Sequence, residues 1–347
     1  MAETRGVGLG RLRWFLLWLL GFNATWAGIV VVTDAWSTVA QHWGIAVAMA
    51  LGSYVAGSTP MGGGTVGFPI LVLVFDLPAS FGRDFGFAIQ SIGMTSASIF
   101  ILCTGRPLER RILRWSMLGA LVATPLSVAF LAPHVDERVA KMLFAVVWGS
   151  FGIMHVVKLG EICAVTGMTR MAPAFDRVAG LLIGILGGGL FASLTGVGID
   201  MLLYVVLVLL ARADLKIAIP TSVVLMAWTS LVGIASLLAI AEIAPAVWTP
   251  DPELRGNWLA AAPVVALGAP FGVFVVTLIG RKPTLLAVSI LCLLQFAWMA
   301  WSQRQSLGVS GIGLSLLGLL LFNAAFHVMY GLGRSLEARR GHTERLQ

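Results

Sequence analysis

Two glycine-rich segments of this chain carry residue types that bind anions through the polypeptide backbone. A short apolar run follows each segment, so a helix beginning there would present unpaired N–H groups and the positive end of its dipole to a ligand. Glycine also lets a ligand come close to the backbone and permits a positive φ. The pattern therefore predicts the binding of a small anion. The candidate residues are Gly62, Gly63, Gly64, Thr65, Gly196, Val197 and Gly198.

Close packing of membrane helices through small residues is the alternative interpretation of such segments. We favour packing for the isolated run of glycines at 187–189. For residues 62–64 we favour a break in the helix, because Pro60 and Pro69 lie close by and proline interrupts helical hydrogen bonding.

Asp200 follows the second segment and is the one acidic residue that we place well inside an apolar stretch. A carboxylate within a membrane is costly and is by default a hypothesis of function. Loss of water favours the protonated form, and an ionised Asp200 would repel an anionic substrate. We therefore predict that Asp200 couples proton binding to substrate binding. Capping of the short helix by the Asp200 side chain is an alternative that is compatible with this role.

Polar side chains on the neighbouring helices add hydrogen-bond donors. Bonds between helices, or to the preceding turn of the same helix, are the alternative use of such side chains. Arg83 and Asp84 are expected to form a solvated pair at the outer mouth. The further candidates for substrate binding are Gln90, Ser91, Thr221 and Ser222.

The chain carries no pattern of catalytic or metal-binding residues. Its three cysteines and five histidines are scattered, without Cys-x-x-Cys or Cys/His spacing, and no paired nucleophile and base falls at plausible membrane depth. We therefore expect no enzyme activity, no metal and no cofactor.

Composition identifies an integral membrane protein. Of 347 residues, 58% are hydrophobic and 11% charged, with a mean hydropathy of +0.92, outside the range of soluble proteins. The net charge of +7 could suggest nucleic acid. The basic residues lie in short loops between apolar runs, however, so membrane orientation explains them better, and the expected partners are the lipid bilayer and a small anion.

A full crossing needs about 20 apolar residues. Two further stretches, 43–76 and 178–210, are each too long for one crossing and contain the glycine segments, roughly 134 positions apart. Their second arms, 66–76 and 199–210, would span only about 15–18 Å as helix, so each stretch is expected to be a re-entrant hairpin or a broken helix. The predicted crossings are 12–32, 85–104, 115–133, 142–158, 218–241, 258–279, 283–302 and 311–332.

Loop charge predicts the orientation. The N-terminus, with Arg5, and the tail, with Arg345, are expected to be cytoplasmic, together with the loops around 106–114, 158–177, 212–216 and 281–282. This assignment places most basic residues inside the cell. Residues 11–27 also resemble a signal peptide, but we favour a retained helix because the apolar run continues to Val32. The basic residues left outside are Arg83, Arg138, Lys141, Arg255 and Arg304.

With this orientation the two hairpins enter from opposite sides, which is the inverted-repeat plan of many secondary transporters. The predicted fold is an all-α membrane protein with two inverted repeats, each a hairpin plus three transmembrane helices. The predicted units are an N-terminal flanking helix (1–42), a first repeat (43–158), a cytoplasmic linker (159–177), a second repeat (178–302), and a C-terminal helix with a basic tail (303–347).

Four strings resemble the sulfite exporter TauE/SafE family of membrane transporters over about 43–302. They are Pro60-Met61-Gly62-Gly63-Gly64 with Pro69, Phe87-Ala88-Ile89-Gln90-Ser91-Ile92-Gly93-Met94, Thr195-Gly196-Val197-Gly198-Ile199-Asp200-Met201, and Pro220-Thr221-Ser222. The resemblance implies two homologous repeats, transport of small sulfur-containing anions such as sulfite or organosulfonates across the inner membrane, and proton coupling. The second segment departs from the first, so the two hairpins need not contribute equally to binding.

The function predicted from the sequence is a secondary transporter, an exporter of sulfur-containing anions, that works by alternating access around a midplane site. A transporter of another small organic anion and an anion channel remain the alternatives. The sequence leaves open the exact substrate, the coupling ion, the direction of transport and the oligomeric state, a homodimer included.

Overall fold

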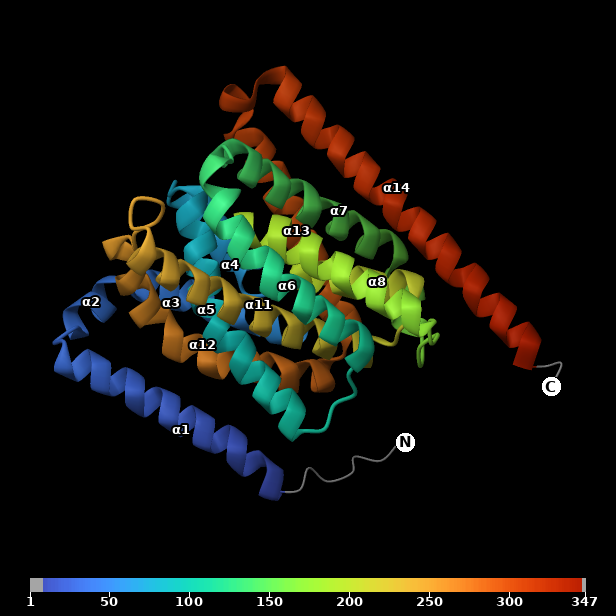
Figure 1. Cartoon of the computed structure of the whole chain (residues 1–347), viewed down its shortest axis with the longest axis horizontal. Coiled ribbons are helices and arrows are strands. Elements are labelled where there is room, and N and C mark those ends of the chain that lie inside the picture. Colours follow the sequence, from blue (N-terminus) through green and yellow to red (C-terminus); the bar gives the residue numbers. More distant parts are fainter. Residues whose placement is uncertain (1–8, 345–347) are drawn as a thin grey trace.

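The computed structural model describes residues 9–344, and over that range the chain is built from helices without a strand (Figure 1). Four short segments, labelled η, are π-helices or a 3₁₀ turn. In chain order the elements are α1 (Leu9–Val32), α2 (Trp36–Gln41), α3 (Trp43–Ser58), α4 (Gly64–Pro69), η1 (Ile70–Val74), α5 (Ala79–Cys103), α6 (Arg110–Phe130), η2 (Ala132–His134), α7 (Glu137–Ala164), α8 (Pro173–Ile183), η3 (Gly184–Ala192), α9 (Ser193–Thr195), α10 (Ile199–Val205), η4 (Val206–Leu210), α11 (Leu215–Ile243), α12 (Pro252–Ile279), α13 (Arg281–Ser302) and α14 (Arg304–Glu344).

Nine helical segments within the described residues are long and apolar enough to cross a membrane. The prediction of an all-α, multi-pass membrane protein is therefore confirmed. Eight of the nine correspond to the predicted crossings, and the ninth, Pro173–Thr195, is the first arm of the second hairpin. Arg5 and Arg345, which entered the predicted orientation, lie outside the described residues.

Acidic residues fix where four of the long helices begin. Glu109, Asp136, Asp214 and Asp251 each accept the backbone N–H of the residue two positions later. Such caps satisfy donors that the first turn of a helix leaves unpaired. They explain why α7, α11 and α12, of 28, 29 and 28 residues, start earlier than the apolar pattern alone predicts.

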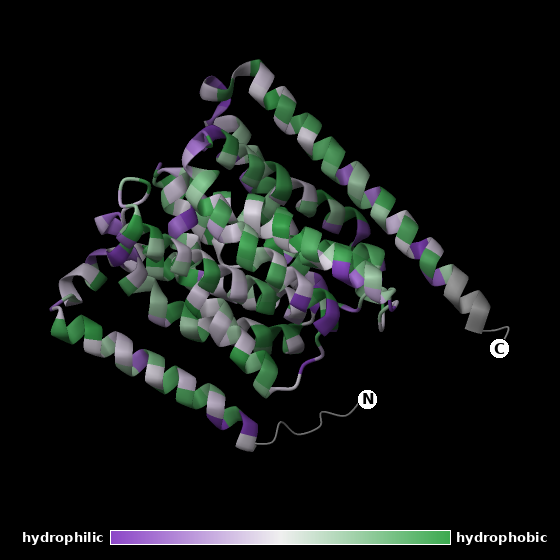
Figure 2. Ribbon diagram, viewed as in Figure 1, coloured by the Kyte–Doolittle hydropathy of each residue, from purple (hydrophilic) through white to green (hydrophobic). Residues whose placement is uncertain are grey.

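The core is organised around α5, which packs against α11 and α12. Helix α3 lies along α12, α13 along α7, and α6 along both α8 and η3. Helices α1 and α14 flank this bundle (Figure 1), and only 11% of the apolar window of each is buried. Apolar residues recur along both flanking helices (Figure 2), as expected for helices that face lipid.

Small residues allow the close approach of the inner helices. A methyl group on Gly57 of α3 would lie 1.8 Å from the carbonyl oxygen of Ala269 on α12. On Gly184 of η3 it would lie 2.3 Å from the carbonyl oxygen of Ser116 on α6. The packing expected for the glycines at 187–189 is also found, since Gly188 lies against Thr124 and Ala120. These contacts follow the small-residue rule of membrane helices.

The loops gather at two ends of the bundle. At one end the second hairpin is closed by hydrogen bonds from Thr169 N–H to Ala211 C=O (2.8 Å) and from Asp214 N–H to Gly167 C=O (2.6 Å). At the other end Trp248 Nε1 donates to Asp84 Oδ2 at 2.7 Å. The second hairpin therefore leaves the bundle at the end where it enters.

The close contact of α3 with α12 predicts a measurable cost for one methyl group. Gly57→Ala is expected to lower the free energy of unfolding by about 1–3 kcal/mol, because the added Cβ forces two backbones apart. Gly28→Ala on α1 is the matched control, since no atom lies within 4 Å of its Cβ position. Thermal unfolding in detergent measures both, and equal melting temperatures for the two variants would contradict the contact.

Candidate functional site

Both long stretches are interrupted where the sequence indicates. The first break, at 59–63, lies between α3 and α4, and Gly62 has a φ of +64°. The second break, at 196–198, lies between α9 and α10, where Gly196 and Gly198 have φ of +76° and +106°. Residues other than glycine rarely adopt such backbone angles. These positions need glycine for the turn itself.

The two half-helices that follow the breaks end in the same way. Each finishes in a five-residue π-helix, η1 or η4, and then in a residue of positive φ, Asp76 (+53°) or Arg212 (+49°). The spacing between Asp76 and Arg212, 136 positions, pairs Gly62 with Gly198. This spacing lies within two residues of the separation of roughly 134 positions between the glycine segments in the sequence.

The two breaks meet. A methyl group on Gly64 would lie 2.2 Å from Val197 Cγ1. On Gly62 it would lie 2.4 Å from Gln90 Oε1 and 3.1 Å from Asp200 Oδ2. The structure thus brings Gly62, Gly64, Gln90, Val197 and Asp200 together at a single junction, which we call the hairpin junction.

Gln90, on α5, holds the second break. Its Nε2 donates to the carbonyl oxygen of Gly196 at 2.8 Å and to that of Gly86 at 3.3 Å. The side chain is 1% exposed, and no described residue donates to its Oε1. Gln90 therefore satisfies a backbone carbonyl that the break would otherwise leave unpaired.

Asp200 caps the second half-helix. Its Oδ1 accepts the N–H groups of Gly198 (3.2 Å) and Met201 (3.0 Å), so the capping alternative is present. The residue is fully buried, and its Oδ2 has no hydrogen-bond partner among the described residues. Capping uses one carboxyl oxygen and leaves the other free for a second role.

Thr65 anchors the first break through residues of both halves. Trp148 Nε1, on α7, donates to Thr65 Oγ1 at 2.8 Å, and Gln295 Nε2, on α13, donates to the Thr65 carbonyl oxygen at 2.8 Å. Neither residue was among the predicted site residues. The signal that could have pointed to them is a polar N–H group in the middle of an apolar crossing, where a partner must be found.

Gly63 lies at the same break but packs toward α3, where its Cβ position is 3.3 Å from Met49 Cε. Three other predicted site residues use their hydroxyl groups elsewhere. Ser91 donates to Ala88 C=O and Ser222 to Ala218 C=O. Thr221 donates to Ile217 C=O and accepts the N–H of Glu109, in the loop before α6.

Arg83 and Asp84 form the expected ion pair, with a distance of 2.7 Å from Arg83 Nη2 to Asp84 Oδ1, but the pair is not solvated. The residues are 6% and 7% exposed, because Trp248 covers Asp84 and the tip of the second hairpin packs against Arg83. A methyl group on Gly196 would lie 2.5 Å from the Arg83 carbonyl oxygen.

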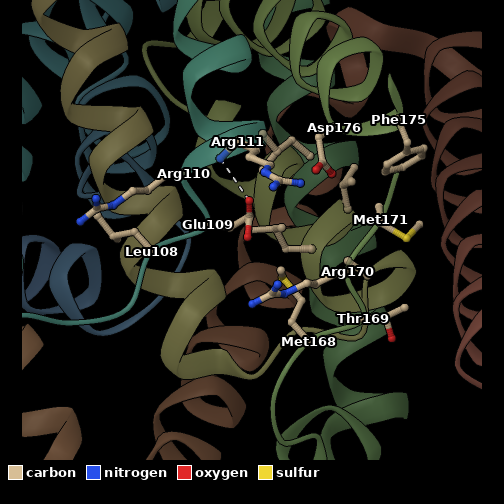
Figure 3. Close-up of a pocket in the computed structure, with 14 residues that line it drawn as sticks. Leu108, Glu109, Arg110, Arg111, Met168, Thr169, Arg170, Met171, Phe175 and Asp176 are labelled. Atoms are coloured by element: carbon tan, nitrogen blue, oxygen red, sulfur yellow. Dashed lines mark hydrogen bonds between the residues drawn. The ribbon is translucent and has the colours of Figure 1, made fainter. Parts of the chain in front are cut away.

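A larger pocket of about 280 Å³ lies at the base of the second hairpin. In Figure 3 the guanidinium of Arg111 points toward Glu109 and Asp176, Arg170 lies on the opposite side of Glu109, and Arg110 points away. Residues Leu207 and Ala211 of the hairpin form part of the wall. The hairpin junction, by contrast, is buried: Gln90 is 1% exposed, and Val197 and Asp200 are 0% exposed.

Among the residues whose side chains the structure describes, no group of three or more His, Cys, Asp or Glu residues could hold a metal ion.

A family model described as Sulfite exporter TauE/SafE matches residues 44–299, which is most of the chain. This range contains both breaks and all the predicted site residues. No curated protein and no solved structure matches the chain significantly.

The contact between the breaks can be tested by a rescue experiment. Gly64→Ala places a Cβ against Val197 Cγ1 and is expected to destabilise the protein by about 1–3 kcal/mol. Adding Val197→Ala removes that methyl group and should restore part of the melting temperature. If the double variant melts at the temperature expected from two independent changes, the breaks do not touch.

Proposed function

Because the chain belongs to the sulfite exporter TauE/SafE family, we propose that it is a secondary transporter that exports small sulfur-containing anions such as sulfite or organosulfonates. The anion binds at the hairpin junction, and access to it alternates between the two sides of the membrane. Membership of a transporter family agrees with the expectation that the protein is not an enzyme.

The observation that carries the proposal is the meeting of two backbone breaks deep in the helical bundle. Among the described residues, no acceptor is hydrogen-bonded to the N–H groups of Gly63, Gly64 or Val197. An anion that leaves water needs donors in place of its hydration, and N–H groups at the start of a half-helix provide them. A sulfite or sulfonate group spreads its charge over three oxygens, so several such donors suit it.

The described arrangement is closed, because at most 1% of Gln90, Val197 and Asp200 is exposed at the junction. Binding therefore requires the hairpins to move apart. This favours a transporter, which alternates between closed and open states, over a channel with a continuous polar pore.

We also propose that the repeats are inverted. Supporting this, both half-helices end in a π-helix and a residue of positive φ at matching positions. In addition, the second hairpin is closed at one end of the bundle, whereas Asp84, which follows the first hairpin in the chain, contacts Trp248 at the opposite end. In this arrangement each half supplies one break, and rocking of one half against the other exposes the junction to each side in turn.

The orientation that we propose puts the end containing Arg111, Arg170 and Arg212 in the cytoplasm and the protein in the inner membrane, following the positive-inside rule. The pocket at the base of the second hairpin would then be the cytoplasmic entrance. Its arginines attract anions, while Glu109 and Asp176 keep that attraction moderate.

Asp200 is the proposed carrier of a coupled proton. It is the only carboxyl group at the hairpin junction, and one of its oxygens is unused by the cap. Protonation removes a charge that repels an anion, so the proton and the anion favour each other's binding.

The substrate is tested by uptake into vesicles that contain the purified protein. Sulfite, thiosulfate, sulfoacetate and taurine are compared with simple carboxylates, with and without a pH gradient. We expect saturable flux of at least one sulfur-containing anion that responds to the gradient. Flux of carboxylates alone would reject the sulfur-anion proposal, and a conductance that rises linearly with concentration would indicate a channel.

The role of Asp200 is tested by Asp200→Asn, which keeps the shape of the side chain and an oxygen for the cap but cannot ionise. We expect a folded protein whose transport no longer depends on pH, whereas a single coupled proton changes the wild-type rate by up to about tenfold per pH unit. A pH profile identical to that of the wild type would remove Asp200 from the coupling role.

A further inference from the structure

Two buried oxygen atoms border the same small space at the hairpin junction without a donor. Gln90 Oε1 and Asp200 Oδ2 lie 2.4 Å and 3.1 Å from the Cβ position of Gly62. Neither accepts a hydrogen bond from any residue that the structure describes. Buried acceptors without a donor are unfavourable, and two of them that face the same space also repel each other.

The orientation of the Gln90 amide is fixed by its other end. Nε2 donates to two carbonyl oxygens, those of Gly196 and Gly86. Reversing the amide would place Oε1 against these two oxygens, which can only accept. Gln90 Oε1 must therefore remain on the side of Gly62 and Asp200.

The two oxygens of Asp200 are not equivalent. Oδ1 accepts two backbone N–H groups, from Gly198 and Met201, and its lone pairs are thereby used. Oδ2 has no such partner. A proton on the carboxyl group therefore belongs on Oδ2, the atom that borders the same space as Gln90 Oε1.

We propose that Asp200 is protonated on Oδ2 in this closed arrangement and that the Oδ2–H group donates to Gln90 Oε1, so that one shared proton joins α5 to the second hairpin. The inference rests on the proposed proton coupling through Asp200 and identifies the partner of the proton. When the proton leaves Oδ2, a carboxylate faces the same space as the amide oxygen of Gln90, and the two oxygens repel each other.

A proton fits the hairpin junction better than a sodium ion does. An alkali cation stripped of water needs several oxygens around it, whereas only two unpaired side-chain oxygens border this space.

Other titratable groups near α10 do not take the place of Gln90. Tyr204, on α10 itself, is hydrogen-bonded to His155 Nε2 at 2.8 Å, and Arg83 and Asp84 on α5 are paired with each other. No titratable side chain among the described residues forms a hydrogen bond or an ion pair with the Asp200 side chain. The titratable residues on the other helices packed against α10 are Asp176, Arg177, Lys216 and Glu242.

The chain contains a matched control for Gln90. Gln295 is also buried, donates its Nε2 to a carbonyl oxygen of the opposite hairpin at 2.8 Å, and has an Oε1 without a donor. It differs in that its amide contacts Thr65, at the start of the first half-helix. The Gln90 amide instead contacts Gly196, in the second break, which directly precedes the half-helix that contains Asp200. Replacing either glutamine removes the same kind of bond, but only the Gln90 change removes the acceptor of the proton.

The test is infrared difference spectroscopy of the full-length protein in lipid vesicles, without a transported anion. The C=O band of a protonated carboxylic acid that disappears in Asp200→Asn is assigned to Asp200. In Gln90→Leu we expect this band to move to higher frequency, because the O–H group loses its acceptor. The pH at which the band disappears should fall by about one unit. In Gln295→Leu both quantities should stay at their wild-type values.

A band that does not move in Gln90→Leu, or that moves equally in Gln295→Leu, would overturn the shared proton. So would a band that sodium ions abolish at constant pH. Gln90→Met, which keeps the length of the side chain, replaces Gln90→Leu if the latter fails to fold. If the band shifts as expected but the protein transports no sulfur-containing anion, the proposed substrate is rejected and the shared proton is retained.

Discussion

Backbone hydrogen bonding at the two helix breaks is the constraint on which the rest of this structure depends. Inside a membrane no bulk water satisfies the N–H and C=O groups that a break exposes, so protein groups must do so. Here Asp200 accepts the N–H groups of Gly198 in the second break and of Met201 in the first turn of α10. Gln90 donates to the carbonyl oxygen of Gly196 in the second break, and Gln295 donates to that of Thr65, at the start of α4. Each break is thus held by a side chain from a distant segment, and the two halves of the chain become one unit.

The same bonds explain why the centre of the bundle is so closely packed. A glutamine reaches a carbonyl oxygen of the opposite hairpin only if the helices approach closely, and the glycines at the breaks and along α3, α6 and η3 permit that approach. Helices α1 and α14 take no part in these bonds and face the lipid. Polar bonding and small-residue packing therefore depend on each other at the centre, whereas the flanking helices require only apolar surface.

The hairpins are similar in backbone and different in chemistry. The first offers glycine N–H groups around Gly63 and Gly64, and its carbonyl at Thr65 is held by Gln295. The second adds Asp200, a group that can gain or lose a proton. In the proposed mechanism the first hairpin contributes mainly to holding the anion, and the second links that anion to the proton. In that proposed mechanism the difference between the two glycine segments has a chemical reason, since only one of two related sites needs a titratable group.

The sequence by itself determined the membrane class, the helical fold, the positions of the two breaks and the placement of Asp200 inside the bundle, because each follows from local composition or from the cost of one group in an apolar run. Only the tertiary structure decided which side chains meet. Gln90 forms a hydrogen bond with Gly196, 106 positions away in the sequence, and Gln295 forms one with Thr65, 230 positions away. No local sequence pattern encodes such partners. For the same reason the sequence could not reveal that the hydroxyl groups of Thr221, Ser222 and Ser91 bond elsewhere, or that the Arg83–Asp84 pair is buried. Hydrogen-bond partners and burial are properties of neighbours in space, and those neighbours exist only once the chain has folded.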